Sequence, residues 1–398
     1  MRSTSMRSVV VAVSLVTSLF AAGCSVNTGA EEADSSEANL SSAPEIGVLL
    51  GSHCDIDDVG TELEPYVKSA FLKNDGIPLP DAVRPILSGP AWALSRGTVE
   101  AQYAAIGPTR YRANAAKQVA AVNTALKAQG IKGKAYLGCD FTFPSIGDAL
   151  DNMRRDGVKK IVLFNKGAQY SIATGGEHME DAITYMKEHP TFAPQKFVMV
   201  KEFSSDPRFR KLLGDVIQRD VNTAFPGAPK KDVCILVASH GLPLRMVQNG
   251  DPATNQMLDV VRELKQRFSG YDLRHGFLND DFFPGAEWTT PKAIDVAVDL
   301  RRESCPNVFM DSRLSFTTHH RATLFDLDVE AREELESPDV QPSGELHPLY
   351  QPAKVVFGQN FDAEPGLAAL FASLTKEALD GRIQDLVEVT RTAKVPTK

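Results

Sequence analysis

The segment from Cys234 to Pro252, CILVASHGLPLRMVQNGDP, decides the fold class of this 398-residue chain. It opens with an aliphatic run that ends on Ser239, His240 and Gly241. A short apolar run bounded by Gly and Pro is typical of an interior strand in a parallel sheet, because both faces of such a strand are buried. His240 is then expected at the carboxyl end of the strand, the edge at which open α/β sheets bind ligands. The alternative is a histidine that only hydrogen-bonds a loop.

Comparable apolar runs predict further strands along the chain. They lie at 46–50, 135–137, 161–164, 197–200, 233–238, 273–278, 308–310 and 355–357. Between them, apolar residues recur at helical spacing in four segments, 113–129, 146–156, 206–222 and 255–267. Alternating strands and helices predict an α/β protein with two doubly wound, Rossmann-like domains, parallel sheets and an interdomain cleft. We expect the domains at 45–225 and 226–350, with a C-terminal strand and helix in 351–398 that pack back on the body.

A weak internal repeat relates two strand ends. VLLGSHCD at 48–55 and ILVASHGL at 235–242 both run from apolar residues into Ser-His. Chance is the alternative explanation for so short a match. If it reflects duplication, His53 and His240 occupy equivalent corners of two domains and face each other across the cleft, where ligands commonly bind.

The first residues differ in kind from the rest. Arg2 and Arg7 precede an apolar stretch that ends in AAGCS, the pattern of an export signal over 1–24. The residues before Cys24 resemble a bacterial lipobox, which implies lipid on the Cys24 thiol and an envelope lipoprotein, on the periplasmic face of the outer membrane. Residues 25–44 have almost nothing to bury and are expected to form a disordered tether.

Charge and cysteine content narrow the alternatives. The net charge of −8 and the lack of a basic stripe argue against nucleic-acid binding. Besides Cys24 there are four cysteines, Cys54, Cys139, Cys234 and Cys305. Two disulfides, one or none are all compatible with their spacing. Cys54 and Cys139 both follow predicted strands of the first domain, so they could bridge or bind a metal.

Motifs spread from about residue 45 to residue 385 resemble those of ferrochelatase, which inserts ferrous iron into protoporphyrin. The opening segment corresponds to the family's Ser-Ala-His-Gly-Leu-Pro and Gly-Asp-Pro. Further similar segments follow in the family's order: GVLL at 47, YAAIG at 103, QYSIATGG at 169, GAEWTTP at 285 and TTHHRATLFDLDVE at 317. The resemblance implies a chelatase-like fold.

The resemblance also implies roles for particular residues. Metal insertion releases two pyrrole N–H protons, and a neutral imidazole accepts a proton near pH 7, which makes His240 the proton acceptor or a metal ligand. His53 is expected opposite it, as a second catalytic group and metal ligand. Expected contacts to the substrate are Ser239, Gly241, Leu242, Pro243, Gln169, Tyr170 and Trp288. The alternatives are that Trp288 is a packing anchor and that Gln169–Ser171 only build a turn.

The chain departs from the family at its other metal-handling positions. The family's catalytic glutamate is Ala322, its preceding aspartate is His319, and Phe143 replaces a histidine before proline, whereas His320 is retained. Ala322, Asp326 and Glu330 are spaced to share one helix face, which carries a file of carboxylates in the family. Without the resemblance, the simpler interpretation of Asp326 and Glu330 is a solvent-exposed helix surface. With the resemblance, we expect His319, His320, Asp326 and Glu330 to be further metal ligands.

The predicted function is insertion of a divalent metal, Fe²⁺ first, into a porphyrin as in haem biosynthesis. The tetrapyrrole and the metal ion are the expected partners, with the membrane reached through a lipid anchor; neither an organic cofactor nor an iron–sulfur cluster is expected. One alternative is a cobalt or nickel chelatase for another tetrapyrrole. The other is a non-catalytic envelope protein that binds haem, porphyrin or metal, which the alanine at position 322 favours.

Overall fold

The computed structural model describes residues 43–77, 79–279, 287–337 and 353–396. The predicted export signal, Cys24 and nearly all of the predicted tether lie outside these ranges. Among the described residues, no helix is both long and apolar enough to cross a bilayer.

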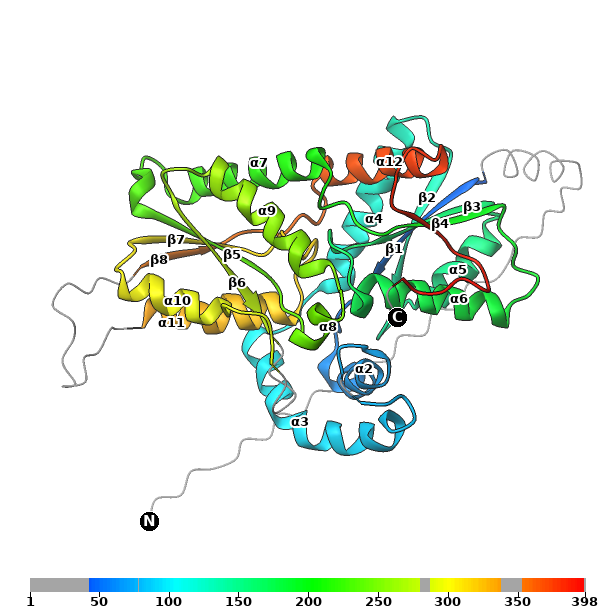
Figure 1. Cartoon of the computed structure of the whole chain (residues 1–398), viewed down its shortest axis with the longest axis horizontal. Coiled ribbons are helices and arrows are strands. Elements are labelled where there is room, and N and C mark those ends of the chain that lie inside the picture. The colour runs from blue at the N-terminus through cyan, green and yellow to red at the C-terminus, as the bar shows by residue number, and fades with distance from the viewer. Residues whose placement is uncertain (1–42, 78, 280–286, 338–352, 397–398) are drawn as a thin grey trace, which may run out of the picture. The chain divides into compact units, whose positions relative to one another are not determined.

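Two separate sheets organise the described residues (Figure 1). The first has the order β2-β1-β3-β4-β9 and the second the order β6-β5-β7-β8. All neighbours are parallel except β4 and β9, so the predicted α/β class with parallel sheets is confirmed. The first-sheet strands are β1 Ile46–Ser52, β2 Gly133–Cys139, β3 Lys160–Asn165, β4 Lys196–Val200 and β9 Leu386–Glu388. The second-sheet strands are β5 Val233–His240, β6 Asp272–Leu278, β7 Asn307–Asp311 and β8 Lys354–Phe357.

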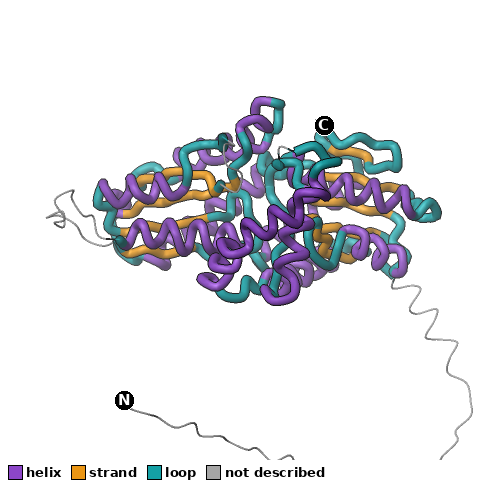
Figure 2. Tube along the Cα trace, turned by 90° about the horizontal axis from the view of Figure 1, so that it is seen from below, coloured by secondary structure: helices purple, strands orange, loops and turns teal. Residues whose placement is uncertain are grey.

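Helices connect the strands and pack along the faces of the two sheets (Figure 1 and Figure 2). The four segments predicted from apolar spacing are α4 Tyr111–Ala128, α5 Ile146–Arg155, α7 Pro207–Ala224 and α9 Ala253–Arg267. Near the C-terminus, β8 forms an edge of the second sheet, whereas α12 packs against α4 of the first half. The remaining helices are α2 Val59–Lys73, α3 Arg84–Ile106, α6 Glu177–Glu188, α8 Leu244–Gln248, α10 Ala293–Arg302, α11 Arg332–Glu336 and α12 Pro365–Leu379.

The strands β1 and β5 hold corresponding central positions in their sheets. Each lies between two parallel neighbours, and apart from its ends each is buried along its length. His53 directly follows β1, and His240 is the last residue of β5. Both histidines therefore lie at the carboxyl edge of a sheet, where side chains from several strands converge.

The Gln169–Ser171 and Gly-Asp-Pro motifs join the two halves. Asp251, at 1% exposure, accepts hydrogen bonds from Ser171 Oγ at 2.7 Å and from the Ile172 backbone N–H at 2.8 Å. Gln169 Nε2 donates to the Leu314 carbonyl at 3.0 Å. Buried polar groups need such partners, so these contacts fix the position of one half on the other.

Two disulfides close loops in the two halves. Cys54 is bonded to Cys139, and Cys234 to Cys305, across sequence separations of 85 and 71 residues. Of the alternatives left open by spacing, the structure has two bridges, and Cys54 and Cys139 are bonded to each other rather than to a metal. The first bridge adjoins His53 and Asp140, the residues next to its two cysteines.

A buried histidine next to the β5 motif makes the stability pH-dependent. His275 on β6 is 8% exposed, Ser239 Oγ lies 2.7 Å from its Nε2, and burial lowers its pKa to about 4. The unfolded chain binds a proton here near pH 6.5, so this stabilising contribution is present above pH 6.5 and is lost as the pH falls toward 4. Between pH 7 and 5 we expect a loss of about 2 kcal/mol from His275.

Urea unfolding of the wild type and of His275→Gln over this pH range checks the prediction. Glutamine keeps a hydrogen-bonding side chain without titrating, so its free energy of unfolding should fall less steeply with acid. Equal slopes would show that His275 is not the group responsible.

Candidate active site between the two sheets

One cavity is lined by residues at the carboxyl ends of strands from both sheets. Seven of the site residues predicted from sequence line it, and so does Ala322; the seven are His53, His240, His320, Gln169, Leu242, Pro243 and Trp288. His53 and Gln169 come from the first half, and the other five and Ala322 come from the second. The predicted approach of His53 and His240 across an interdomain cleft therefore corresponds to a cavity that both residues line.

The second-half wall presents His240 and His320, whose rings both lie near that of Phe316. The Phe316 ring centroid lies 6.0 Å from that of His240 and 4.5 Å from that of His320. His240 Nδ1 lies 2.5 Å from the Gly241 carbonyl oxygen, which assigns the proton to Nδ1 and the basic lone pair to Nε2. Burial and the nearby charges of His240 and Arg321 keep the pKa of His320 well below its usual value. His320 Nδ1 also accepts a hydrogen bond from the Ala322 backbone N–H at 3.2 Å, so His240 Nε2 is the atom of this wall suited to accepting a proton.

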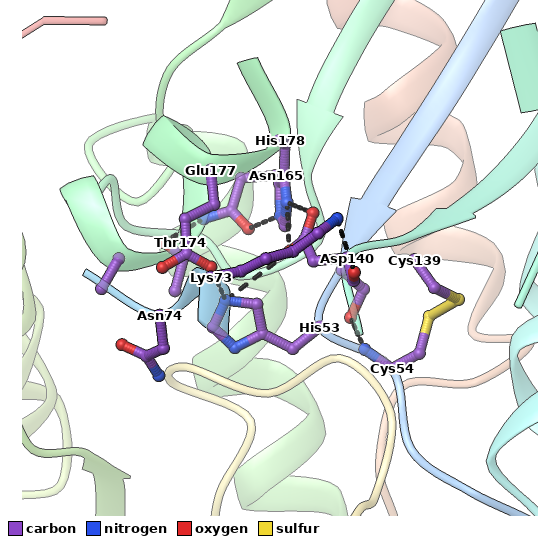
Figure 3. Close-up of polar contacts among 12 residues, drawn as sticks. His53, Cys54, Lys73, Asn74, Cys139, Asp140, Asn165, Thr174, Glu177 and His178 are labelled. Atoms are coloured by element: carbon purple, nitrogen blue, oxygen red, sulfur yellow. Dashed lines mark hydrogen bonds and ion pairs between the residues drawn. A yellow bond between two sulfur atoms is a disulfide. The ribbon is translucent and has the colours of Figure 1, made fainter. Parts of the chain in front are cut away.

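The first-half wall carries a cluster of one imidazole and two buried carboxylates (Figure 3). His53 Nε2 lies 3.6 Å from Asp140 Oδ2 and 3.3 Å from Glu177 Oε2. Asp140 is 3% exposed and Glu177 is 5% exposed. The three ligand atoms lie within 4.8 Å of one another, a spacing that one metal ion can bridge. We call His53, Asp140 and Glu177 the metal corner.

Neighbouring residues hold the metal corner in place. His178 Nδ1 lies 2.8 Å from Asp140 Oδ2, its Nε2 lies 3.1 Å from Asn165 Oδ1, and the Asp75 backbone N–H donates to Glu177 Oε1 at 2.8 Å. Gly51 permits this packing, because a Cβ there would approach His178 Cδ2 to 2.7 Å. Such outer partners orient ligands and tune their basicity.

The charge state of the metal corner also favours a cation. Burial, with the negative charge of Asp140, raises the pKa of Glu177 well above its usual value. Glu177 Oε2 is buried without a hydrogen-bond partner among the described residues. The carboxylates of Asp140 and Glu177 are both buried away from water and repel each other when ionised, and a bound divalent cation would offset that repulsion. Imidazole and carboxylate ligands suit first-row transition metals.

Sequence reasoning identified only His53 in this cluster. Asp140 follows β2, His53 follows β1, and Glu177 begins α6 beyond β3, so three adjacent strands bring together residues far apart in sequence. For His53 and Asp140 the available signal was a polar residue just beyond an apolar run, in GSH and GCD, whereas Glu177 lies twelve residues beyond the end of β3 and had no such signal.

Among the described residues, six expected site residues lie outside this lining: Asp326 and Glu330, which line a second cavity, and four whose packing explains their position. His319 turns away, with its ring 4.8 Å from that of Phe357 and its Nδ1 3.2 Å from Thr323 Oγ1. Ser239 is fully buried against His275. Tyr170 is 1% exposed in the core of the first half, where Gly175 leaves room for its ring. Gly241 packs against Asn279.

Asp326 and Glu330, the two carboxylates expected on one helix face, lie outside the cavity. Residues Ala322–Ala331 form a π-helix rather than the α-helix assumed from the spacing. Ala322 lines the cavity, whereas Asp326 and Glu330 line a second cavity, which shares Arg321 with the first. Asp326 Oδ1 accepts from Arg321 Nη1 at 3.1 Å. Asp328 instead pairs with Arg332.

Phe143, which replaces a family histidine, does not line the cavity. It is 53% exposed, and the Arg112 guanidinium lies 4.4 Å from its ring centroid.

Comparison with known proteins identifies the family. The profile of the ferrochelatase family matches residues 45–344. The chain belongs to the ferrochelatase family. This match covers the first sheet apart from β9, the second sheet apart from β8, and every residue of the cavity named above.

Similar curated proteins are ferrochelatases at low identity. Chloroplastic ferrochelatase-2 of Hordeum vulgare is 27% identical over 300 residues, which cover 72% of this chain and 60% of the relative. The ferrochelatase of Gloeobacter violaceus is 26% identical over 307 residues, which cover 74% of this chain and 90% of the relative. The first plant and animal relatives are matched over only 47 to 62% of their length.

Similar solved structures include SirB from Bacillus subtilis with Fe³⁺, with a TM-score of 0.49 and 11% identity over 85% of this chain and 98% of that one. The sirohydrochlorin chelatase SirB of subspecies spizizenii with cobalt has a TM-score of 0.43 and 12% identity over 67% of this chain and 90% of that one.

Proposed function

We propose that this ferrochelatase-family chain inserts a divalent metal ion into a tetrapyrrole. One observation carries the proposal: a single cavity has a proton-accepting imidazole, that of His240, on one wall and a buried metal corner on the other. Insertion requires both, because a metal must be delivered and two N–H protons must leave. The ferrous ion and a porphyrin of haem biosynthesis are the proposed substrates, from family membership.

The apolar part of the cavity suits a flat macrocycle. Its lining includes aromatic and aliphatic side chains from both halves, among them Tyr66, Phe71, Val99, Leu242 and Trp288. Burial of apolar surface of this kind stabilises a bound hydrophobic ring system. Trp288 lines this part of the cavity, and its backbone forms an antiparallel β-bridge with that of Pro243. It can therefore be a packing anchor and a ligand contact at the same time.

In the proposed mechanism the metal is first held by His53, Asp140 and Glu177. The tetrapyrrole then lies between this corner and the opposite wall, and His240 Nε2 accepts one pyrrole proton. His240 then passes this proton to water and accepts the second, because His320 Nδ1 already accepts a hydrogen bond from the Ala322 backbone N–H and the pKa of His320 is held well below its usual value. A neutral imidazole can do this near pH 7 without a large change in its pKa.

Export and a lipid on Cys24 complete the proposal, from the sequence pattern of the first 24 residues. They would put the reaction at the cell envelope, on the periplasmic face of the outer membrane.

Mixing the full chain with protoporphyrin and Zn(II) or Fe(II) and following the visible spectrum tests the proposal. Product in excess of the protein supports metal insertion. A spectral change that stops at one equivalent of protein contradicts it.

Ala322 favours a second candidate function, a non-catalytic binder of haem, porphyrin or metal. Its methyl group lines the cavity where the family has a carboxylate, and it can neither relay a proton nor bind a metal. The one-equivalent outcome of the same experiment supports this candidate.

A further inference from the structure

Lys166 is a buried lysine that the proposed reaction does not use. It is 3% exposed and follows Asn165, the last residue of β3, with its backbone N–H donating to the Gly51 carbonyl at 2.8 Å. Its side chain lines the same cavity as His53 and His240. It therefore faces any ligand that enters.

The ammonium group of Lys166 has polar partners but no counter-charge. Nζ donates to Tyr111 Oη at 3.1 Å and to Thr318 Oγ1 at 2.9 Å, one hydroxyl from each half. Within the described ranges, Lys166 forms no ion pair with a carboxylate; Asp362 acts on it only through longer-range electrostatics. An ammonium has three N–H donors, so the two hydroxyls leave one donor for a further acceptor.

An ammonium buried in this way is unfavourable on its own. Charges removed from water require pairing, and burial accordingly lowers the pKa of Lys166 to about 7. An anion placed at Nζ would supply the missing charge in a region of low dielectric constant, where the attraction is strong.

A second, independent group points to the same ligand. Thr317, also at 3% exposure, lines the cavity, and its Oγ1 is buried without a hydrogen-bond partner among the described residues. A hydroxyl can donate to an anionic oxygen. Other polar side chains in the lining of the same cavity are Asn165, Gln169, Ser171 and Ser315. These polar residues differ in character from the aromatic and aliphatic lining that suits a macrocycle.

We propose that Lys166, assisted by Thr317, binds a carboxylate side chain of the tetrapyrrole and so selects acidic tetrapyrroles and sets their orientation in the cavity. This inference rests on the proposed function. A bidentate carboxylate is the anion that matches one ammonium and one hydroxyl beside an apolar ring site. Lys166 is thus a binding residue that positions the macrocycle between the two walls.

Equilibrium binding without metal tests the inference independently of turnover. The full chain is titrated with protoporphyrin and with its dimethyl ester, in the same mild detergent, and tryptophan quenching is recorded. The wild type should bind the free acid at least about tenfold more tightly than the ester, the size expected for one buried charge-assisted hydrogen bond. Lys166→Met should lose most of this preference and leave the affinity for the ester within about twofold.

Lys160→Met is the matched control. Lys160 is exposed at the opposite end of the same strand, so its loss should leave both affinities unchanged. Thr317→Val should weaken binding of the acid by a smaller factor, in the same direction.

Equal affinity of the wild type for acid and ester overturns the inference and leaves the proposed function standing. Equal weakening of both ligands by Lys166→Met also overturns it. Failure of the wild type to bind either ligand contradicts the tetrapyrrole cavity, and the inference with it.

Discussion

Replacement of His240 by alanine is expected to lower the rate of metal insertion by at least about 100-fold, the usual contribution of a positioned proton acceptor. His240 ends β5, an interior strand of the second sheet, and its Nδ1 proton is directed to the Gly241 carbonyl. Its Nε2 is then the basic atom offered to a pyrrole N–H. Initial rates of Zn(II) insertion, followed by absorbance, measure the effect.

The control for this variant is His189→Ala. His189 follows α6, stacks on Tyr185 and does not line the cavity, so its loss should leave the rate unchanged. Binding of the tetrapyrrole should survive in His240→Ala, because the aromatic and aliphatic lining is intact. A variant that binds the macrocycle and still inserts metal at the wild-type rate would remove His240 from the mechanism.

The variants Asp140→Asn and Glu177→Gln are each expected to weaken binding of divalent metal on the order of 100-fold. Loss of outer-shell partners alone costs 10- to 100-fold, and these changes remove charged ligands. Each substitution keeps the shape of the side chain and removes one negative charge facing His53. Titration of metal-free protein with Zn(II) by calorimetry gives the affinities.

Glu180→Gln provides a matched charge change on the same helix. Glu180 lies three residues beyond Glu177 on α6 but is exposed to solvent and is not part of the metal corner. Its loss should shift the affinity by less than about twofold, because an exposed charge is screened by water and salt. If Glu177→Gln and Glu180→Gln behave alike, the metal does not bind at this corner.

Much of the fold followed from local patterns. The eight predicted strands exist because buried parallel strands require unbroken apolar runs such as 233–238, and such runs are visible in one sequence. The short strand β9 was not predicted, since three residues, Leu-Val-Glu, carry no periodic signal. The pairing of the four cysteines could not be predicted either, because the spacing of cysteines does not determine which of them are bonded.

The site was predictable only where one motif contains both the strand and the functional residue. That is the case for His240 in ASHGLP and for His53 in GSHC. Asp140 and Glu177 can be recognised as partners of His53 only once β2, β1 and β3 are known to lie side by side. That order of strands is a long-range property of the sheet. Tyr170 illustrates the opposite error, since a motif residue became a core residue once Gly175 allowed its ring to pack inside.

The most direct test of the whole account is the initial rate of Fe(II) insertion into protoporphyrin under anaerobic conditions, compared between the full chain and a protein-free solution. If the two walls act together, the protein should raise the rate by at least about 100-fold and make many products per chain. A rate equal to that of the protein-free solution, with the porphyrin bound but unmetallated, would contradict the account.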